Sequence, residues 1–119
     1  QAGILSWGQD MDQQHNPFQC NLGYQVSLSG KGEWNKKSDY VGKAALEKMK
    51  ADIKAGQKPY KLQLFGMELG GKPIEHYAPD FWLVSPDNGG DPVGFLTSPW
   101  WHPQKKTNIA MGYVPFDGT

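Results

Sequence analysis

Only one stretch of this sequence carries a helical repeat, and that single helix limits the folds open to the chain. Apolar side chains recur at every fourth position across residues 40–55, which predicts a helix that Ser38 or Asp39 can cap. Gly56 suits the left-handed position after a helix, and Pro59 cannot continue one. The repeating positions are Val41, Ala45, Met49 and Ile53, and the predicted outer face holds Lys43, Glu47, Lys50 and Lys54, where Glu47 can pair with Lys43 or Lys50.

Strand patterns separated by glycine and proline turns fill most of the remaining sequence. The clearest covers residues 20–29, where apolar and polar side chains alternate until residues 30–32 end the pattern. Residues 61–69 change phase in mid-strand, which indicates a bulge or burial on both faces. Shorter strands are predicted over 81–84, 93–98 and 108–114, with turns at 70–71 and 86–90. This spacing favours an antiparallel barrel or sandwich after a boundary at residues 56–59.

The composition argues against several classes of function. The 119 residues include 12 lysines, no arginine and 12 acidic residues, so nothing in the charge favours nucleic acid or an anionic membrane as a partner. No apolar run approaches the roughly 20 residues of a membrane span. A single cysteine rules out an internal disulfide framework and favours a reducing compartment, which predicts a cytoplasmic protein.

The residue types that usually carry catalysis or bind metals are scattered along the chain. The three histidines have no ligand-like spacing to one another or to Cys20, so no metal site is predicted. Cys20 lies on the apolar side of its predicted strand and is expected to be inert packing. Asp10 and Asp12 could bind a cation or shape a turn, and turn formation is the commoner use of such residues.

The aromatic residues are the most informative feature. Trp100 and Trp101 lie between Pro99 and Pro103, and adjacent side chains on such a rigid loop point to different sides. At least one of these rings is expected to meet a ligand, a partner or solvent, and a structural plug or domain-interface role is an equal alternative. An aromatic wall suits a flat heterocycle, and it also suits a cation such as a sulfonium.

Several ordered stretches resemble the glycine cleavage T-protein (aminomethyltransferase) family. The first resembles the family's Ala-Gly-x-x-Leu-Tyr-Gly-x-Asp-Ile-Asp signature, and the last resembles its Asn-Ile-Ala-x-Gly-Tyr-Val-Pro strand. Together they span nearly the whole chain. In order, they are residues 3–12 (GILSWGQDMD), 17–26 (PFQCNLGYQV), 39–46 (DYVGKAAL), 65–69 (FGMEL), 94–98 (GFLTS) and 108–115 (NIAMGYVP).

This resemblance implies an α+β fold made of parts of two domains. Residues 1–57 would finish a folate-binding region, and residues 58–119 would begin a C-terminal antiparallel β-barrel that stays incomplete. It also implies tetrahydrofolate as the cofactor and a longer polypeptide, whose N-terminal and C-terminal parts are missing from this segment. The family's folate-contacting acidic residues would precede Gln1, so no catalytic residue is assigned here and the segment alone is expected to be inactive.

Three departures from the ordinary T-protein pattern resemble the dimethylsulfoniopropionate demethylases of the same superfamily. They are residues 6–8 (SWG), 70–82 (GGKPIEHYAPDFW) and 97–103 (TSPWWHP). The implied reaction moves a methyl group from dimethylsulfoniopropionate to tetrahydrofolate, giving methylthiopropionate and 5-methyltetrahydrofolate. Family aromatic positions fall on Trp7 and Tyr24, which are expected to share one cleft. Ser6 and Trp100 are further candidates for cofactor or substrate binding.

Three alternatives stay open beside the demethylase. The chain could be part of a T-protein that takes an aminomethyl group from a lipoyl partner. It could instead be a non-catalytic folate-binding relative, or part of a sarcosine or dimethylglycine enzyme. The sequence does not assign an oligomeric state.

Overall fold

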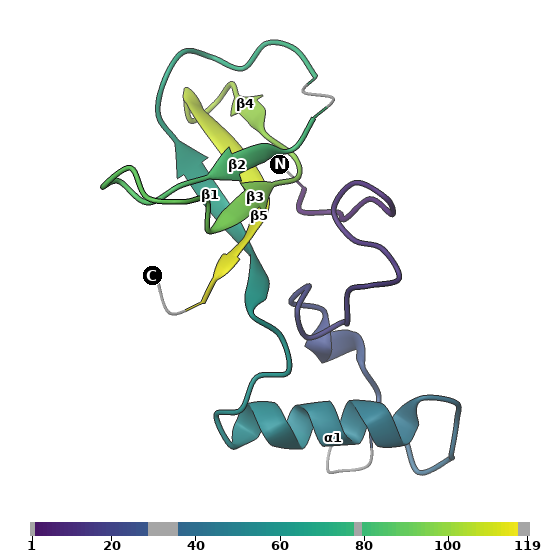
Figure 1. The fold of residues 1–119 in the computed structure, drawn as a ribbon. Helices are drawn as coiled ribbons and strands as arrows, with labels where there is room; N and C mark the ends of the chain where they lie inside the picture. The colour runs from purple at the N-terminus through teal and green to yellow at the C-terminus, as the bar shows by residue number, and fades with distance from the viewer. Residues whose placement is uncertain (1, 29–35, 78–79, 117–119) are drawn as a thin grey trace.

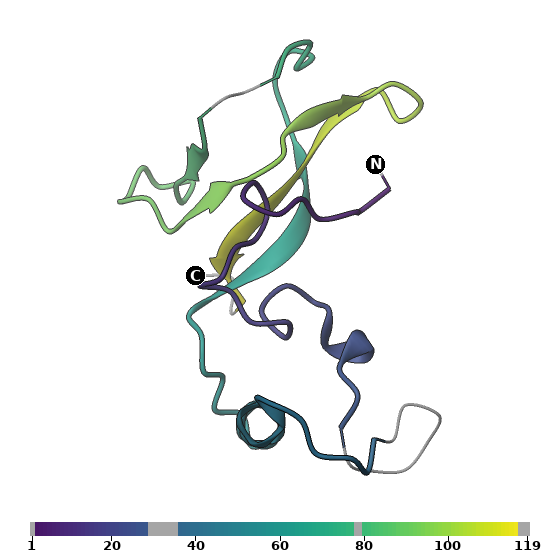
Figure 2. The same ribbon diagram turned by 90° about the vertical axis from the view of Figure 1, so that its right-hand side faces the viewer.

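The computed structural model describes residues 2–28, 36–77 and 80–116. Within these ranges the chain forms a five-stranded antiparallel sheet and one α-helix that lies apart from it (Figures 1 and 2). The strand order is β1-β5-β3-β2, and β4 pairs with another part of β5. The elements are α1 (Lys43–Lys54), β1 (Leu62–Leu69), β2 (Trp82–Val84), β3 (Gly94–Leu96), β4 (Trp100–His102) and β5 (Thr107–Pro115). The α+β class is therefore confirmed, whereas the sheet is open rather than closed into a barrel.

β5 is the centre of the sheet because it pairs with β1 on one side and with β3 and β4 on the other. Its pairing with β1 runs without a break from Leu62↔Pro115 to Leu69↔Asn108, so β1 contains no bulge. Burial on both faces is only partial: Leu64 is buried on one face, and Phe65 is half-buried on the other.

β3 and β5 approach each other closely because glycines occupy the crossing points. A Cβ atom on Gly112 would lie 2.6 Å from the carbonyl oxygen of Phe95, and one on Gly94 would collide with the carbonyl oxygen of Tyr113. Side chains larger than hydrogen do not fit there. The two glycines therefore set the distance between the strands.

The strand predicted over residues 20–29 is wrong. The chain there makes one strand-like hydrogen bond, from the amide of Leu64 to the carbonyl oxygen of Gln19 at 3.0 Å, before Asn21 adopts a left-handed conformation with φ 58°. A short 3-10 helix, Gly23–Gln25, follows. Residues 29–35, which include the predicted end of the strand, lie outside the described residues.

Polar side chains replace that strand at the outer edge of β1. Gln19 donates from its side-chain amide to the carbonyl oxygen of Leu62 at 3.0 Å, and Asn21 donates in the same way to the carbonyl oxygen of Leu64. These contacts satisfy backbone groups at the beginning of β1. They do not reach the second half of the strand, which stays an edge in the part of the chain that the structure describes.

α1 begins later than predicted. The residue before it is Gly42, with φ 87°, and neither Ser38 nor Asp39 makes a capping hydrogen bond to the helix. Lys43 is buried rather than on the outer face, because its Nζ donates to the carbonyl oxygens of Lys36 and Ser38, at 2.8 Å each, and to that of Lys37 at 3.3 Å. Lys43 therefore connects the helix to the segment that precedes it.

The charge pair on α1 also differs from the prediction. Lys48 pairs with Asp52 at 2.6 Å, and the ion pairs of the described residues do not include Glu47. Val41 lies outside the helix and is fully exposed. No helix in the described ranges has the length and apolar character needed to cross a membrane.

The C-terminal end of α1 follows the prediction. Gly56 has φ 80°, its amide donates to the carbonyl oxygen of Ile53 at 3.1 Å, and the amide of Gln57 donates to that of Asp52 at 2.8 Å. These two bonds form a Schellman motif, which satisfies carbonyl groups at the helix end. Strands predicted within 61–69, 81–84, 93–98 and 108–114 and the turn closed by Gly89 are also present.

The N-terminal segment, residues 2–22, lies against one face of the sheet (Figure 2). Cys20, Leu64 and Tyr113 form the buried centre of this contact, with Leu5, Met11 and Phe95 packed around them. The beginning of the chain is therefore held by strands that come more than 40 residues later.

Candidate functional site

A cleft of about 760 Å³ lies between the N-terminal segment and the sheet. Its floor is a row of paired residues, in which Glu68 of β1 faces Ile109 of β5, and Ile109 also pairs with Trp100 of β4. Residues 2–10 and 97–100 contribute to the two sides of the cleft. A cleft of this size, whose lining combines apolar side chains with a few polar groups such as Glu68, has the properties of a small-molecule site.

Asp10 joins the two sides of this cleft. Its side chain is 3% exposed, and it accepts hydrogen bonds from the backbone amide of Ser6 at 2.9 Å and from the hydroxyls of Thr97 and Ser98 at 2.6 Å each. The sequence predicted turn formation for Asp10, and the bond from Ser6 has that local role. Its contacts with Thr97 and Ser98 were not predicted, because the partners lie 87 and 88 residues away.

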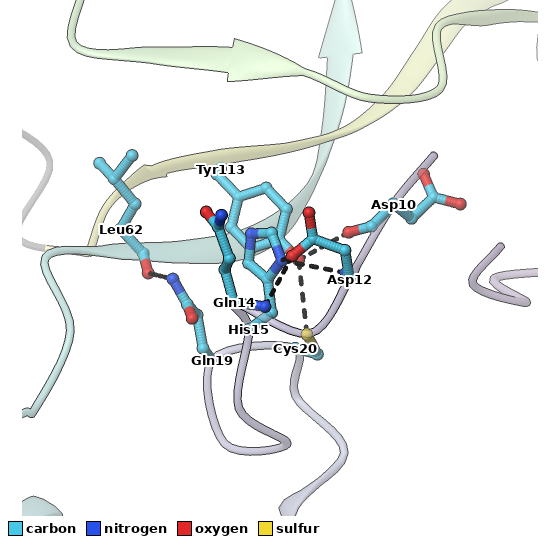
Figure 3. Close-up of polar contacts among 8 residues, drawn as sticks. All are labelled: Asp10, Asp12, Gln14, His15, Gln19, Cys20, Leu62 and Tyr113. Atoms are coloured by element: carbon cyan, nitrogen blue, oxygen red, sulfur yellow. Dashed lines mark hydrogen bonds and ion pairs between the residues drawn. The ribbon is translucent and has the colours of Figure 1, made fainter. Parts of the chain in front are cut away.

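Tyr113 joins three parts of the N-terminal segment (Figure 3). Its hydroxyl donates to the backbone carbonyl of Asp10 at 2.6 Å and lies 3.4 Å from the sulfur of Cys20. The ring of His15 stacks on it, with centroids 4.6 Å apart. Burial, then the neighbouring Cys20 and the carboxylates of Asp10 and Asp12, raise the pKa of Tyr113 well above its usual range.

Two aromatic rings lie at the cleft. Trp100 and Tyr77 line it, with ring centroids 6.2 Å apart. The hydroxyl of Tyr77 donates to the side-chain oxygen of Gln9 at 3.3 Å, and Gln9 donates in turn to the carbonyl oxygen of Thr97. Tyr77 is therefore connected to both sides of the cleft.

β4 explains how the two adjacent tryptophans diverge. The sequence predicted a loop here, but Trp100 and Trp101 lie in a short strand that pairs with Ile109 and Asn108 of β5. Successive side chains of a strand point to opposite faces, so only Trp100 lines the cleft. The predicted divergence of the two rings is correct, although a strand rather than a loop produces it.

The structure brings together two of the four predicted binding residues. Ser6 and Trp100 line the cleft. Tyr24 is 72% exposed and lines a second, more open hollow beside Phe18 and Tyr60. Trp7 is 69% exposed and lines neither cavity, so in the described structure Trp7 and Tyr24 do not share a cleft. Ligand roles for all four residues stay predictions.

The remaining chemically active side chains have structural contacts. Asp12 accepts from the amide of Gln14 at 2.8 Å, which is the predicted turn-forming use, and its carboxylate lies 3.0 Å from Nδ1 of His15. Cys20 is buried in the core, as predicted, although its surroundings are a turn rather than a strand. Among the described residues, histidine, cysteine and acidic side chains form no group of three suited to a metal ion.

Comparison with known proteins finds several aminomethyltransferases that are similar to this chain. The chain is 30% identical to an aminomethyltransferase of Synechococcus over 115 residues, which is 97% of this chain and 27% of that protein. It is 31% identical to the Synechocystis aminomethyltransferase and 35% identical to that of Thermosynechococcus vestitus, covering 26% of each. No family model matches the chain.

These relatives define the class of protein that the chain resembles. Similarity to aminomethyltransferases extends over nearly all of its residues, which supports the T-protein superfamily. The chain spans about a quarter of the length of these relatives. A more particular activity is therefore a matter of proposal.

Proposed function

We propose that this chain is part of a tetrahydrofolate-dependent transferase of the T-protein superfamily. The observation that carries the proposal is the similarity of about 30% to aminomethyltransferases across 97% of the chain. Their length supports a longer polypeptide that includes this segment, and the single cysteine supports a cytoplasmic location. The expected residue boundary, with residues 1–57 in the folate-binding region and 58–119 in the C-terminal domain, is part of the same proposal.

The names of these relatives make an aminomethyl group the first candidate for the donated group. Each of them is named an aminomethyltransferase, so the first candidate for the full-length polypeptide is aminomethyl transfer to tetrahydrofolate. Tetrahydrofolate supplies the nucleophilic nitrogen in such a reaction. The role of this chain is then to place and enclose the reactants, which is a large part of catalysis in group transfer.

The second candidate is methyl transfer from dimethylsulfoniopropionate. Trp100 and Tyr77 favour it, because two partly exposed rings at a cleft can hold a sulfonium by cation–π attraction. A crowded aromatic mouth is also a poor entrance for a lipoyl arm. Under this proposal Trp100 contacts the sulfonium and Ser6 lies at the opposite side of the cleft, while Trp7 and Tyr24 would contact the folate only beside other parts of the full-length protein.

One assay separates these candidates. The full-length polypeptide is incubated with tetrahydrofolate and either dimethylsulfoniopropionate or an aminomethyl-lipoyl partner protein. Methylenetetrahydrofolate from the second donor supports aminomethyl transfer, whereas 5-methyltetrahydrofolate together with methylthiopropionate from the first supports the demethylase. Folate binding without turnover of either donor would leave a non-catalytic relative and refute both candidates.

A matched pair of tryptophan variants tests the aromatic contact. Trp100→Ala should raise the KM for a sulfonium donor about tenfold, because one cation–π contact contributes roughly 0.5–2 kcal/mol. Trp82→Ala is the control, since Trp82 is exposed to a similar degree (42% against 45%) but does not line the cleft. Equal effects of the two substitutions would contradict a sulfonium contact at Trp100.

A further inference from the structure

The loop from Ser6 to Met11 (loop 6–11) is closed on itself. The amide of Asp10 donates to the carbonyl oxygen of Ser6 at 2.9 Å, and the amide of Gly8 donates to that of Met11 at 2.7 Å. The carboxylate of Asp10 accepts the amide of Ser6 across the same loop. Loop 6–11 is therefore closed by backbone bonds and by one bond to the Asp10 carboxylate.

The same carboxylate connects this closed loop to the end of β3. One of its oxygens, Oδ1, accepts both hydroxyls of Thr97 and Ser98, while Oδ2 accepts the amide of Ser6. Thr97 is only 1% exposed, and its amide donates to the carbonyl oxygen of Met111 at 2.8 Å, so this anchoring point is itself fixed to β5. Loop 6–11 is thus bonded to the rigid part of the sheet.

Burial makes this connection sensitive to substitution. Asp10 is 3% exposed, and the ion pairs of the described residues do not include it, so its charge is stabilised by neutral donors. A buried carboxylate is costly unless its oxygens are hydrogen-bonded. Losing one acceptor oxygen would also remove the hydrogen bond made to it.

The bonds of Asp10 join residues that line opposite sides of the cleft. Ser6, Gln9 and Asp10 line the cleft from loop 6–11, and residues 97–100 line it from the sheet. Asp10 is bonded to both groups. The separation of the two groups, and with it the width of the cleft beside Trp100, depends on these bonds together with the bond from Gln9 to the carbonyl oxygen of Thr97.

We infer that Asp10 is the positioning residue of the cleft: its carboxylate holds loop 6–11 and residues 97–98 at the separation that a bound ligand requires. It acts through Ser6, Thr97 and Ser98 and does not itself react. The kinetic part of this inference rests on the proposed folate-dependent function. The structural part does not depend on that function.

The test compares Asp10→Asn with Asp12→Asn in the full-length polypeptide. The asparagine at position 10 keeps one acceptor oxygen for the hydroxyls but cannot accept the amide of Ser6. Asp12 is the matched control, because it lies in the same segment, bonds with Gln14 and His15 in the described residues, and does not line the cleft. Melting curves establish first that both variants are folded.

Two readouts follow for the folded variants. In D10N, amide hydrogen exchange should become about tenfold faster at residues 6–11. The KM of this variant for tetrahydrofolate should rise about tenfold, with a smaller change in kcat. D12N should stay within about twofold of wild type in its exchange rate and in its KM. Unchanged KM in a folded D10N protein with a loosened loop would overturn the positioning role. Unchanged exchange would overturn the connection itself.

A second set of variants covers the case in which D10N does not fold. Thr97→Val with Ser98→Ala removes both hydroxyl donors and keeps the carboxylate, and it should reproduce the faster exchange of loop 6–11. If wild-type protein neither binds nor turns over tetrahydrofolate, the proposed function fails. The hydrogen-exchange rates of loop 6–11 then test by themselves whether Asp10 holds the loop to residues 97–98. Normal exchange in the double variant would refute that connection.

Discussion

At the scale of the residue, Tyr113 shows how one buried hydroxyl couples folding to pH. Its ring is 1% exposed, and its hydroxyl donates to the carbonyl oxygen of Asp10. Burial, then Cys20 and the nearby carboxylates, raise its pKa above the ordinary value of 10.0. Above about pH 10 the unfolded chain therefore loses a proton that the folded chain keeps, so the free energy of unfolding falls as pH rises.

Tyr113→Phe tests this coupling. The variant should lose about 1–2 kcal/mol of unfolding free energy at neutral pH, because a buried hydrogen bond is removed. This deficit should shrink above about pH 10, by up to roughly 1.4 kcal/mol per pH unit. Urea denaturation at several pH values measures it, and Tyr24→Phe controls for loss of a hydroxyl from an exposed ring. A deficit that stays constant with pH would contradict the coupling.

The candidate site was partly predictable at this same scale. The adjacency of Trp100 and Trp101 was sufficient to predict that their rings diverge, because that depends on local geometry. The role of Asp10 could not be predicted, because its hydroxyl partners lie 87 and 88 residues away and no sequence pattern connects them. Trp7 and Tyr24 were paired by resemblance, and the described structure does not bring them into one cleft.

At the scale of the element, the sequence correctly predicted the helix end and the strands that depend on residues close together in the chain. Gly56 fixes the end of α1 through its own left-handed conformation, and burial alternates along the first part of β5 because successive side chains point to opposite faces of the sheet. The alternation over residues 20–29 was misleading because Asn21 turns the chain away after one hydrogen bond. β4 was missed because it is short, flanked by prolines and formed only by pairing with β5.

The contact between β3 and β5 gives a prediction at this scale. Gly112→Ala should lower the free energy of unfolding by about 1–3 kcal/mol, because its Cβ would lie 2.6 Å from the carbonyl oxygen of Phe95 and the strands must separate. Gly66→Ala, on the adjacent strand β1, meets nothing within 4 Å and should be neutral or slightly stabilising. Thermal or urea denaturation compares the two, and equal losses would refute a specific close approach.

At the scale of the whole molecule, the open sheet leaves β1 with an unprotected edge. Residues 19–21 cover its beginning, but in the described chain no strand pairs with its outer side. The alternation of β-sheet hydrogen bonds directs the amides of Gly66 and Glu68 toward that side, as it does the amide of Leu64. Exposed edges of this kind promote pairing between chains.

The 119-residue chain is therefore expected to self-associate as its concentration increases. Gly66→Pro should reduce this association, because it removes an outward amide without removing a bond to β5. Light scattering after gel filtration measures the mass of each variant, and Gly70→Pro, beyond the end of β1, is the control. A wild-type chain that stays monomeric and melts cooperatively at high concentration would contradict the expectation.

The contact between residues 2–22 and the sheet has a consequence for synthesis on the ribosome. Asp10 and Tyr113 are 103 residues apart, so the residues between them must leave the exit tunnel before Asp10 can meet Tyr113. Such distant contacts form slowly, because a long stretch of chain must close before any bond is gained. Until then Leu5, Met11 and Cys20 lack part of the core that covers them, and exposed apolar side chains of this kind are what chaperones bind.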